Sequence, residues 1–94
     1  MTKRLSATLL ALPVALAPVA GLADTLRVAL VLPGSITDGT FNSAAHDAIQ
    51  AAQEAYDIEV SIRENTDFAQ ITEALTAYAR DGFDVVIGHG FQFA

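Results

Sequence analysis

The sequence predicts an α/β fold in which β-α-β-α-β elements form an open parallel sheet. Three observations predict it: an apolar run at residues 26–32 that ends at a Pro-Gly pair, two further strand-like runs, and an amphipathic helical stretch before each of them. Consecutive β-α units that feed parallel strands imply right-handed crossovers and helices that cover the sheet. A chain of 94 residues allows at most one small domain.

The first strand and the first helix follow from the apolar pattern. Residues 26–32 form a short apolar run, as expected of a strand that is buried on both faces of the sheet. From residue 43 to residue 56, apolar side chains recur at helical spacing and polar side chains take the other face. The predicted buried face of this helix consists of Ala45, Ala48, Ile49, Ala52 and Tyr56.

The second β-α unit is equally regular. Residues 58–63 alternate between apolar and polar side chains, which is typical of an edge strand with one solvated face. In the helix that follows, Asp67 and Gln70 form the expected capping pair and Gly82 the C-terminal stop. The predicted buried stripe of this helix consists of Phe68, Ile71, Leu75, Tyr78 and Ala79. Residues 84–88 are then expected to form the third strand.

Residues 1–23 have the pattern of a secretory signal peptide. Two basic residues, Lys3 and Arg4, precede an apolar stretch, and small residues at positions 21 and 23 favour cleavage after Ala23. The alternative is a retained transmembrane anchor, but Pro13 and Pro18 interrupt the apolar stretch. The sequence therefore predicts export, most simply to a periplasm.

The composition excludes several classes of function. The chain has 5 Lys and Arg against 11 Asp and Glu, a net charge of −6, and no Cys. An acidic chain lacks the positive surface that binds the phosphate backbone, so nucleic acid is not an expected partner. Without Cys there is no disulfide, thiolate zinc site, cysteine nucleophile or acylated-cysteine anchor.

The predicted sheet is incomplete. Three parallel strands with helices need further strands to bury both faces, and a chain of this size is near the lower limit of independent stability. Residues 88–94 supply no closing helix. We therefore expect residues 24–94 to be the N-terminal piece of a longer protein, either as a fragment or as a truncated reading frame.

Ligands of open α/β sheets bind beyond the carboxyl ends of the strands, which here are residues 33–42 and 88–93. In the first loop Asp38 offers acceptor atoms, Phe41 a stacking surface, and Asn42 both a donor and an acceptor. The alternative is structural: Asp38 in a turn, Phe41 plugging the core and Asn42 as the helix N-cap.

Motifs for catalysis and for phosphate or metal binding are missing from the sequence. There is no G-x-G-x-x-G, no G-x-x-x-x-G-K-[ST] and no G-x-S-x-G, and two distant histidines make no metal motif. His46 is expected to be a solvated helix residue. His89 lies between two glycines after a strand, where it either presents its ring to a ligand or bonds the neighbouring loop. No cofactor and no metal ion are expected.

Two loop motifs, with a shorter segment between them, resemble one protein family. Asp38-Gly39-Thr40-Phe41-Asn42 after the first strand, Glu64-Asn65 after the second and Gly88-His89-Gly90-Phe91 after the third resemble the basic membrane protein (BMP) family. Its members are substrate-binding proteins of ABC transporters and include purine-nucleoside binders. The resemblance runs from about residue 26 to the end. It implies a type I periplasmic-binding-protein fold of two lobes, with this chain as the start of the N-terminal lobe.

The resemblance also implies a ligand site and partners. Phe41 would stack on a planar base, Asp38 and Asn42 would be polar anchors, and the turn after the third strand would line the same cleft. The residues of that turn are Gly88, His89, Gly90 and Phe91. The implied protein is a monomer that binds a nucleoside-like small molecule, without catalysis, and delivers it to an ABC permease in the inner membrane. Many members carry an acylated N-terminal cysteine; its absence here implies a freely diffusing periplasmic protein.

Two other functions remain open on the sequence alone. One is a secreted α/β enzyme such as a nucleoside hydrolase, with Asp38 as base or ribose anchor and His89 as acid. The other is a receptor that reports to a membrane signalling protein. If the chain is the whole gene product, it is a truncated receptor without transport function.

Overall fold

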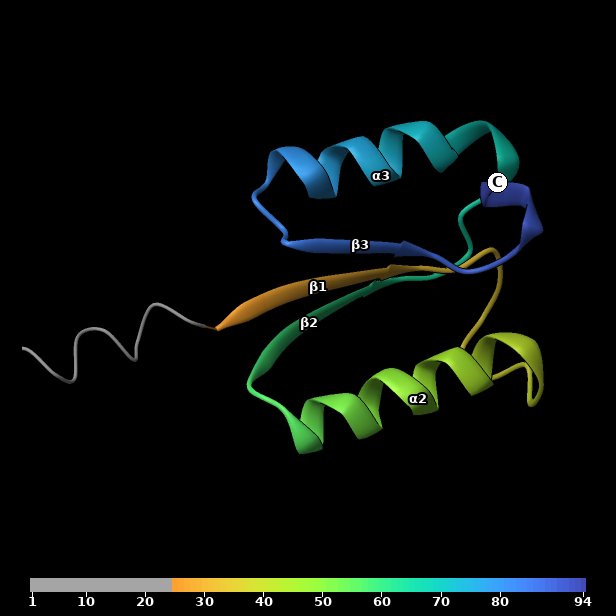
Figure 1. Cartoon of the computed structure of the whole chain (residues 1–94). Coiled ribbons are helices and arrows are strands. Elements are labelled where there is room, and N and C mark those ends of the chain that lie inside the picture. Colours follow the sequence, from red (N-terminus) through yellow and green to blue (C-terminus); the bar gives the residue numbers. More distant parts are fainter. Residues whose placement is uncertain (1–24) are drawn as a thin grey trace, which may run out of the picture.

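The computed structural model describes residues 25–94, and the predicted signal segment lies outside them. Three parallel strands form one sheet in the order β2-β1-β3, with α2 on one face and α3 on the other (Figure 1). The predicted α/β fold with β-α-β-α-β order is confirmed. The elements are β1 (Leu26–Val31), α2 (Phe41–Ala55), β2 (Ile58–Arg63), η2 (Phe68–Gln70), α3 (Ile71–Arg80), β3 (Val85–Gly88) and η3 (Phe91–Phe93), the η elements being 3-10 turns.

The central strand, β1, is buried on both faces, as its apolar run predicts. Val28, Leu30 and Leu32 pack toward α2, where Ile49 completes the buried cluster. On the α3 side, β1 residues 29 and 31 are fully buried, and α3 contributes Ile71 and Ala74 to the core. Because both neighbours of β1 are strands, its backbone is paired on both sides and the strand forms the rigid centre of the molecule.

Helix α2 begins two residues earlier than the periodicity predicts. Its N-cap is Thr40, so Asn42 lies inside the first turn and the expectation that it caps the helix is wrong. The buried face is also narrower than predicted, since Ala48 is exposed and Tyr56 is 70% exposed. The helix packs over β1 and β2, which leaves the part of its apolar face on the β3 side uncovered.

Helix α3 ends as predicted but starts differently. Gly82 adopts φ +86° and its N–H donates to Ala79, while the Phe83 N–H donates to Tyr78, which is a Schellman motif. The Tyr78 and Phe83 rings form the hydrophobic contact of that motif, with centroids 4.9 Å apart. At the other end Asp67 makes no side-chain cap, because η2 intervenes before the helix.

The buried stripe predicted for the helix after β2 is only partly confirmed. Ile71 is buried and Leu75 and Tyr78 are half-buried, but Phe68 is 79% exposed and Ala79 is also exposed. Phe68 belongs to η2 and not to α3, so the helical spacing on which the predicted stripe depends does not extend to it.

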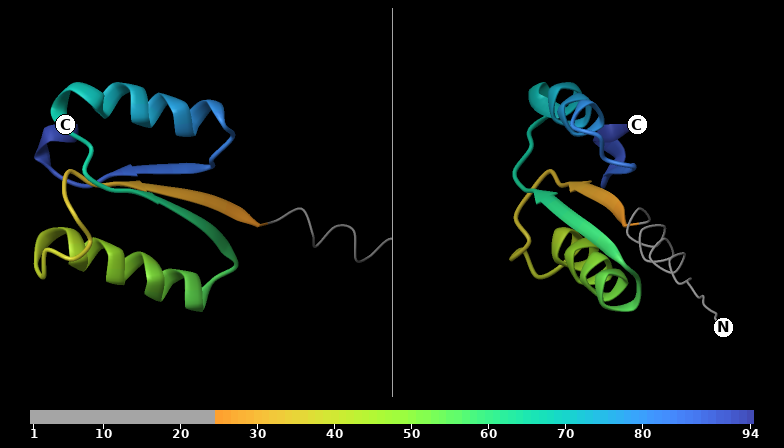
Figure 2. Two further views of the ribbon diagram at one scale, coloured as in Figure 1. Left: turned by 180° about the vertical axis from the view of Figure 1, so that it is seen from behind. Right: turned by 90° about the vertical axis from the view of Figure 1, so that its left-hand side faces the viewer.

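The carboxyl ends of the three strands lie at one edge of the sheet, with the loops after β1 and β3 beside each other (Figures 1 and 2). β2 and β3 are the two outer strands of the sheet, and the outer position of β2 was predicted from its alternation. In residues 25–94, no helix has the length and apolar character needed to cross a membrane.

Candidate functional site

The loop after β1 is held to the end of β2 by four hydrogen bonds. The Leu32 N–H donates to the Arg63 carbonyl at 2.8 Å, and the Thr66 N–H returns to the Leu32 carbonyl at 2.9 Å. Farther along, the Asn65 N–H donates to the Gly34 carbonyl, and the Glu64 carboxylate accepts from the Ile36 N–H at 2.9 Å. The loop that carries the first candidate motif is therefore supported from the neighbouring strand.

Asp38 closes the N-terminus of α2 with its side chain. One carboxylate oxygen accepts from the N–H groups of Thr40 (3.0 Å) and Ser43 (2.9 Å). The other accepts from the Asn42 N–H (2.9 Å) and the Asn42 side-chain amide (2.8 Å). These bonds satisfy N–H groups that a helix start otherwise leaves free, and the negative charge complements the helix dipole.

The same hydrogen bonds set the acidity of Asp38. The backbone N–H of Asn42, followed by those of Thr40 and Ser43, holds the pKa of the carboxyl far below its ordinary value of 3.8. Asp38 is therefore a stable anion at neutral pH. With four donors on two oxygens, its acceptor positions are already used within the loop.

Asn42 lies beneath the surface and not on it. Its side chain is 8% exposed, and Oδ1 is buried without a hydrogen-bond partner among the described residues. Nδ2 must be the atom that faces Asp38, because a carboxylate accepts only. Gly34 makes room for it: a Cβ at Gly34 would lie 2.6 Å from Nδ2. Gly34 and Asn42 thus form one packed unit that keeps Asp38 in place.

Phe41 is an exposed aromatic residue of this edge. It is 49% exposed, so the expectation that it plugs the core is wrong. Its ring stacks on the His89 imidazole, with centroids 3.9 Å apart and an interplanar angle of 24°. His89 Nε2 also lies 3.1 Å from the Phe41 carbonyl oxygen. His89 therefore bonds the neighbouring segment, and the structure joins the first and last predicted motifs across 48 positions of sequence.

The glycines beside His89 have local structural reasons. A Cβ on Gly88 would lie 2.7–2.9 Å from three side-chain atoms of Phe93, and Gly90 adopts φ +136°. They allow the chain to turn sharply into η3, where Phe91 is 91% exposed. Contact of Gly88, Gly90 and Phe91 with a ligand stays a prediction of the sequence.

Sequence reasoning missed Thr66 as part of this edge; Glu64 and Gly34 lie in segments that it singled out, but it gave neither residue a role. Thr66 is 1% exposed and its Oγ1, like Asn42 Oδ1, has no partner in the described part of the chain. The available signal was weak: Glu64 directly follows an edge strand, where it also fits a solvated position. His46, in contrast, lies along α2 beside Asp47 and apart from this arrangement.

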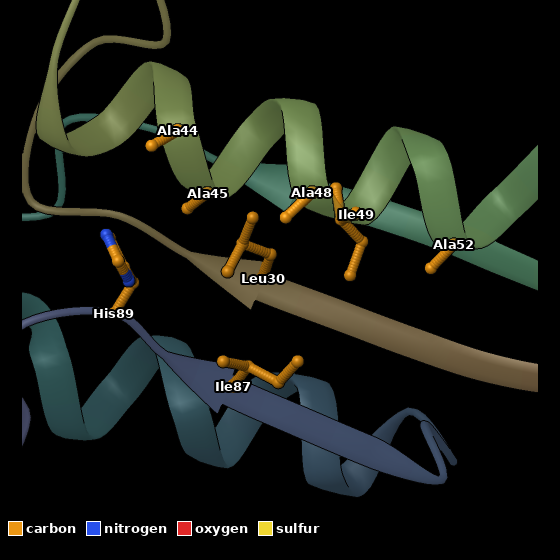
Figure 3. A pocket seen from close by; sticks show the side chains of 8 residues that line it. All are labelled: Leu30, Ala44, Ala45, Ala48, Ile49, Ala52, Ile87 and His89. Carbon is orange, nitrogen blue, oxygen red and sulfur yellow. The ribbon is translucent and has the colours of Figure 1, made fainter.

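An open apolar groove of about 420 Å³ runs between α2 and β3. Its walls are alanine side chains of α2 together with Leu30, Ile49 and Ile87. Figure 3 shows the His89 ring at the end of the groove nearest the start of α2. Among residues 25–94, no group of three or more His, Cys, Asp or Glu is placed to hold a metal ion.

Known proteins are similar to this chain in sequence and in structure. The family model of PnrA-like ABC transporter substrate-binding proteins (Bmp) matches residues 25–94. A solute-binding protein of an ABC transporter system from Conexibacter woesei DSM 14684 is 31% identical, with a TM-score of 0.69 over 73% of this chain. The chain spans 23% of that protein's length. No curated protein matches.

The family match covers the two motifs and everything between them. The structural similarity agrees with it, because the related solved structure is itself a solute-binding protein of an ABC transporter system. The chain belongs to the BMP family of PnrA-like ABC transporter substrate-binding proteins.

Proposed function

We propose that this chain is the first part of the N-terminal lobe of a periplasmic receptor for an ABC importer. The receptor binds a nucleoside-like small molecule between two lobes and delivers it to an inner-membrane permease. Residues 1–23 are the cleaved export signal. The family membership supports a solute receptor, and the arrangement at the carboxyl edge of the sheet supports the planar ligand.

The observation that carries the ligand class is the half-exposed Phe41 ring at the start of α2. A phenyl group in this position costs free energy in water unless a partner covers it, and aromatic rings bind the flat faces of bases. The ring comes from a helix whose start is tied down by Asp38, so its backbone is placed before any ligand arrives. Phe91, also exposed, lies in the turn after β3.

A binding role is better supported than nucleoside hydrolysis. The hydrolase alternative needs Asp38 as a general base or ribose anchor. Its pKa is held far below 3.8 by hydrogen bonds, which makes it a weak base at neutral pH, and its acceptor positions are used within the loop. His89 Nε2 is likewise engaged by the Phe41 carbonyl.

Two features support the assignment of residues 24–94 to part of a lobe. β3 is an edge strand with Val85 39% and Ile87 38% exposed, and the apolar groove beside it has no cover within the described residues. Uncovered apolar surface of this kind marks contact with further polypeptide. The match spans only 23% of the related solved structure, which therefore contains further polypeptide.

Calorimetric titration of the receptor purified from its own host, with guanosine and adenosine as probes, tests the ligand class. Phe41→Ala should weaken binding by about 1–3 kcal/mol, the scale of one aromatic–base stack. Tyr56→Ala is the matched control, since Tyr56 is an exposed aromatic residue at the other end of α2. Unchanged affinity in Phe41→Ala removes this ring from the site, and release of free base from either probe favours the hydrolase.

The mass of the protein in a periplasmic extract of the same host tests export and lobe organisation. A species that starts at residue 24 and has roughly 300 residues, the size of two lobes, is the expected result. An uncleaved species contradicts the signal assignment. A cleaved species that ends at Ala94 contradicts the two-lobe receptor and identifies a truncated one.

A further inference from the structure

His89 is attached to the most rigid part of the molecule. Its backbone N–H donates to the Val31 carbonyl at 3.0 Å, which extends the β1–β3 ladder one residue past the end of β3. The residue that accepts this bond, Val31, is 0% exposed and ends the central strand β1. The position of the His89 backbone is therefore set by the strand ladder, whereas Phe41 lies outside that ladder, at the start of α2.

The two contacts of His89 act on Phe41 from different directions. The imidazole covers one face of the phenyl ring at 3.9 Å, and Nε2 reaches the carbonyl oxygen of the same residue at 3.1 Å. A carbonyl oxygen only accepts, so Nε2 carries a proton and donates. One side chain thus contacts both the ring and the backbone of Phe41.

We propose that His89 is a positioning residue: it holds the Phe41 ring in place as a preformed aromatic platform whose exposed surface receives the planar ligand. This inference rests on the proposed function of Phe41. A freely rotating phenyl group loses side-chain entropy when a ligand stacks on it, and this loss lowers the affinity. Because His89 immobilises the ring beforehand, the ligand no longer has to order it.

Proton NMR of the ligand-free chain tests the positioning contact itself. The imidazole protons of His89 should be shifted upfield by the ring current of Phe41, and this shift should disappear in Phe41→Leu. A long-range nitrogen correlation should show the neutral form protonated at Nε2. Unshifted imidazole protons, or protonation at Nδ1, overturn the proposal whether or not any nucleoside binds.

A double-mutant cycle, titrated with guanosine on the receptor from its host, tests the consequence for binding. His89→Ala should raise Kd about 2- to 10-fold, the range that corresponds to the ordering of one side chain. The same substitution in a Phe41→Ala background should have no further effect, because His89 acts through that ring. His46→Ala is the control, since this histidine contacts Asp47 and not Phe41.

These experiments distinguish failure of the proposed function from failure of the positioning role of His89. The proposed function fails if Phe41→Ala leaves Kd unchanged, or if the wild type binds neither guanosine nor adenosine. In either case the NMR result alone decides whether His89 positions Phe41. If Phe41→Ala raises Kd and His89→Ala does not, only the positioning role fails. An equal effect of His89→Ala in both backgrounds also overturns it, because His89 then contacts the ligand directly.

Discussion

Replacement of Gly34 by alanine tests how the loop after β1 is built. The added Cβ would lie 2.6 Å from Asn42 Nδ2, closer than real Cβ atoms approach a neighbour. Asn42 has little freedom to move, because it is 8% exposed and its amide is bonded to Asp38 at 2.8 Å. The substitution must therefore displace Asn42 and disturb the contact that closes the start of α2.

Two opposing effects determine the size of the change. Overpacking of a well-packed site costs about 1–3 kcal/mol of unfolding free energy. The φ of Gly34 lies outside the left-handed region, so alanine brings no backbone strain and stabilises by about 0.4–1 kcal/mol through a less flexible unfolded chain. The steric effect is larger, and we expect Gly34→Ala to lower the unfolding free energy by about 1–2 kcal/mol.

Urea unfolding monitored by circular dichroism measures this change. With a slope of about 1 kcal/mol per molar urea, typical of a chain this small, the midpoint should fall by about 1–2 M. In an Asn42→Ala background the new Cβ has room, so Gly34→Ala should then be neutral or stabilising. Equal destabilisation in both backgrounds refutes the steric explanation.

Gly39→Ala is the matched control for this cycle. A Cβ at Gly39 would meet nothing within 4 Å, but the φ of +74° is in the left-handed region and costs an alanine about 1–2 kcal/mol. The loss of stability should therefore resemble that of Gly34→Ala in size. It should not depend on Asn42, because its cause is the backbone conformation and not a collision.

Two further predictions concern the cap and the core. The pKa of Asp38 is depressed in the folded chain, so the contribution of Asp38 to stability is complete above the ordinary value of 3.8 and is lost as the pH falls below 3.8. Urea midpoints measured between pH 2 and 7 should show this loss for the wild type and a smaller loss for Asp38→Asn. An equal pH dependence of the two midpoints would contradict the capping role. Leu32→Ala removes a side chain with 0% exposure and should lower the unfolding free energy by about 2–5 kcal/mol, whereas Leu26→Ala, at 42% exposure, should lower it much less. Thermal unfolding of both variants measures the difference. Similar losses in the two variants would contradict the explanation by burial.

The sequence by itself determined the fold class and the family. The apolar run at residues 26–32, the alternation at 58–63 and the stop at Gly82 all predicted elements that the structure confirms. These signals are local: a strand buried on both faces must be apolar throughout, and a helix that ends in a left-handed turn needs glycine. The two loop motifs identified the family for the same reason, since each is a short contiguous segment.

Only the tertiary structure decided which residues of the candidate site contact one another and which are exposed. Periodicity shows which helix face is apolar but not how much of it a neighbour covers, so Ala48 and Tyr56 were wrongly expected to be buried. Asp38, Asn42 and Gly34 share one packed cluster because the loop folds back over the start of α2. The Phe41–His89 stack depends on the parallel order of β1 and β3, which brings residues 48 positions apart to one edge of the sheet. Contacts of this kind arise from strand pairing, and no local pattern in the sequence encodes them.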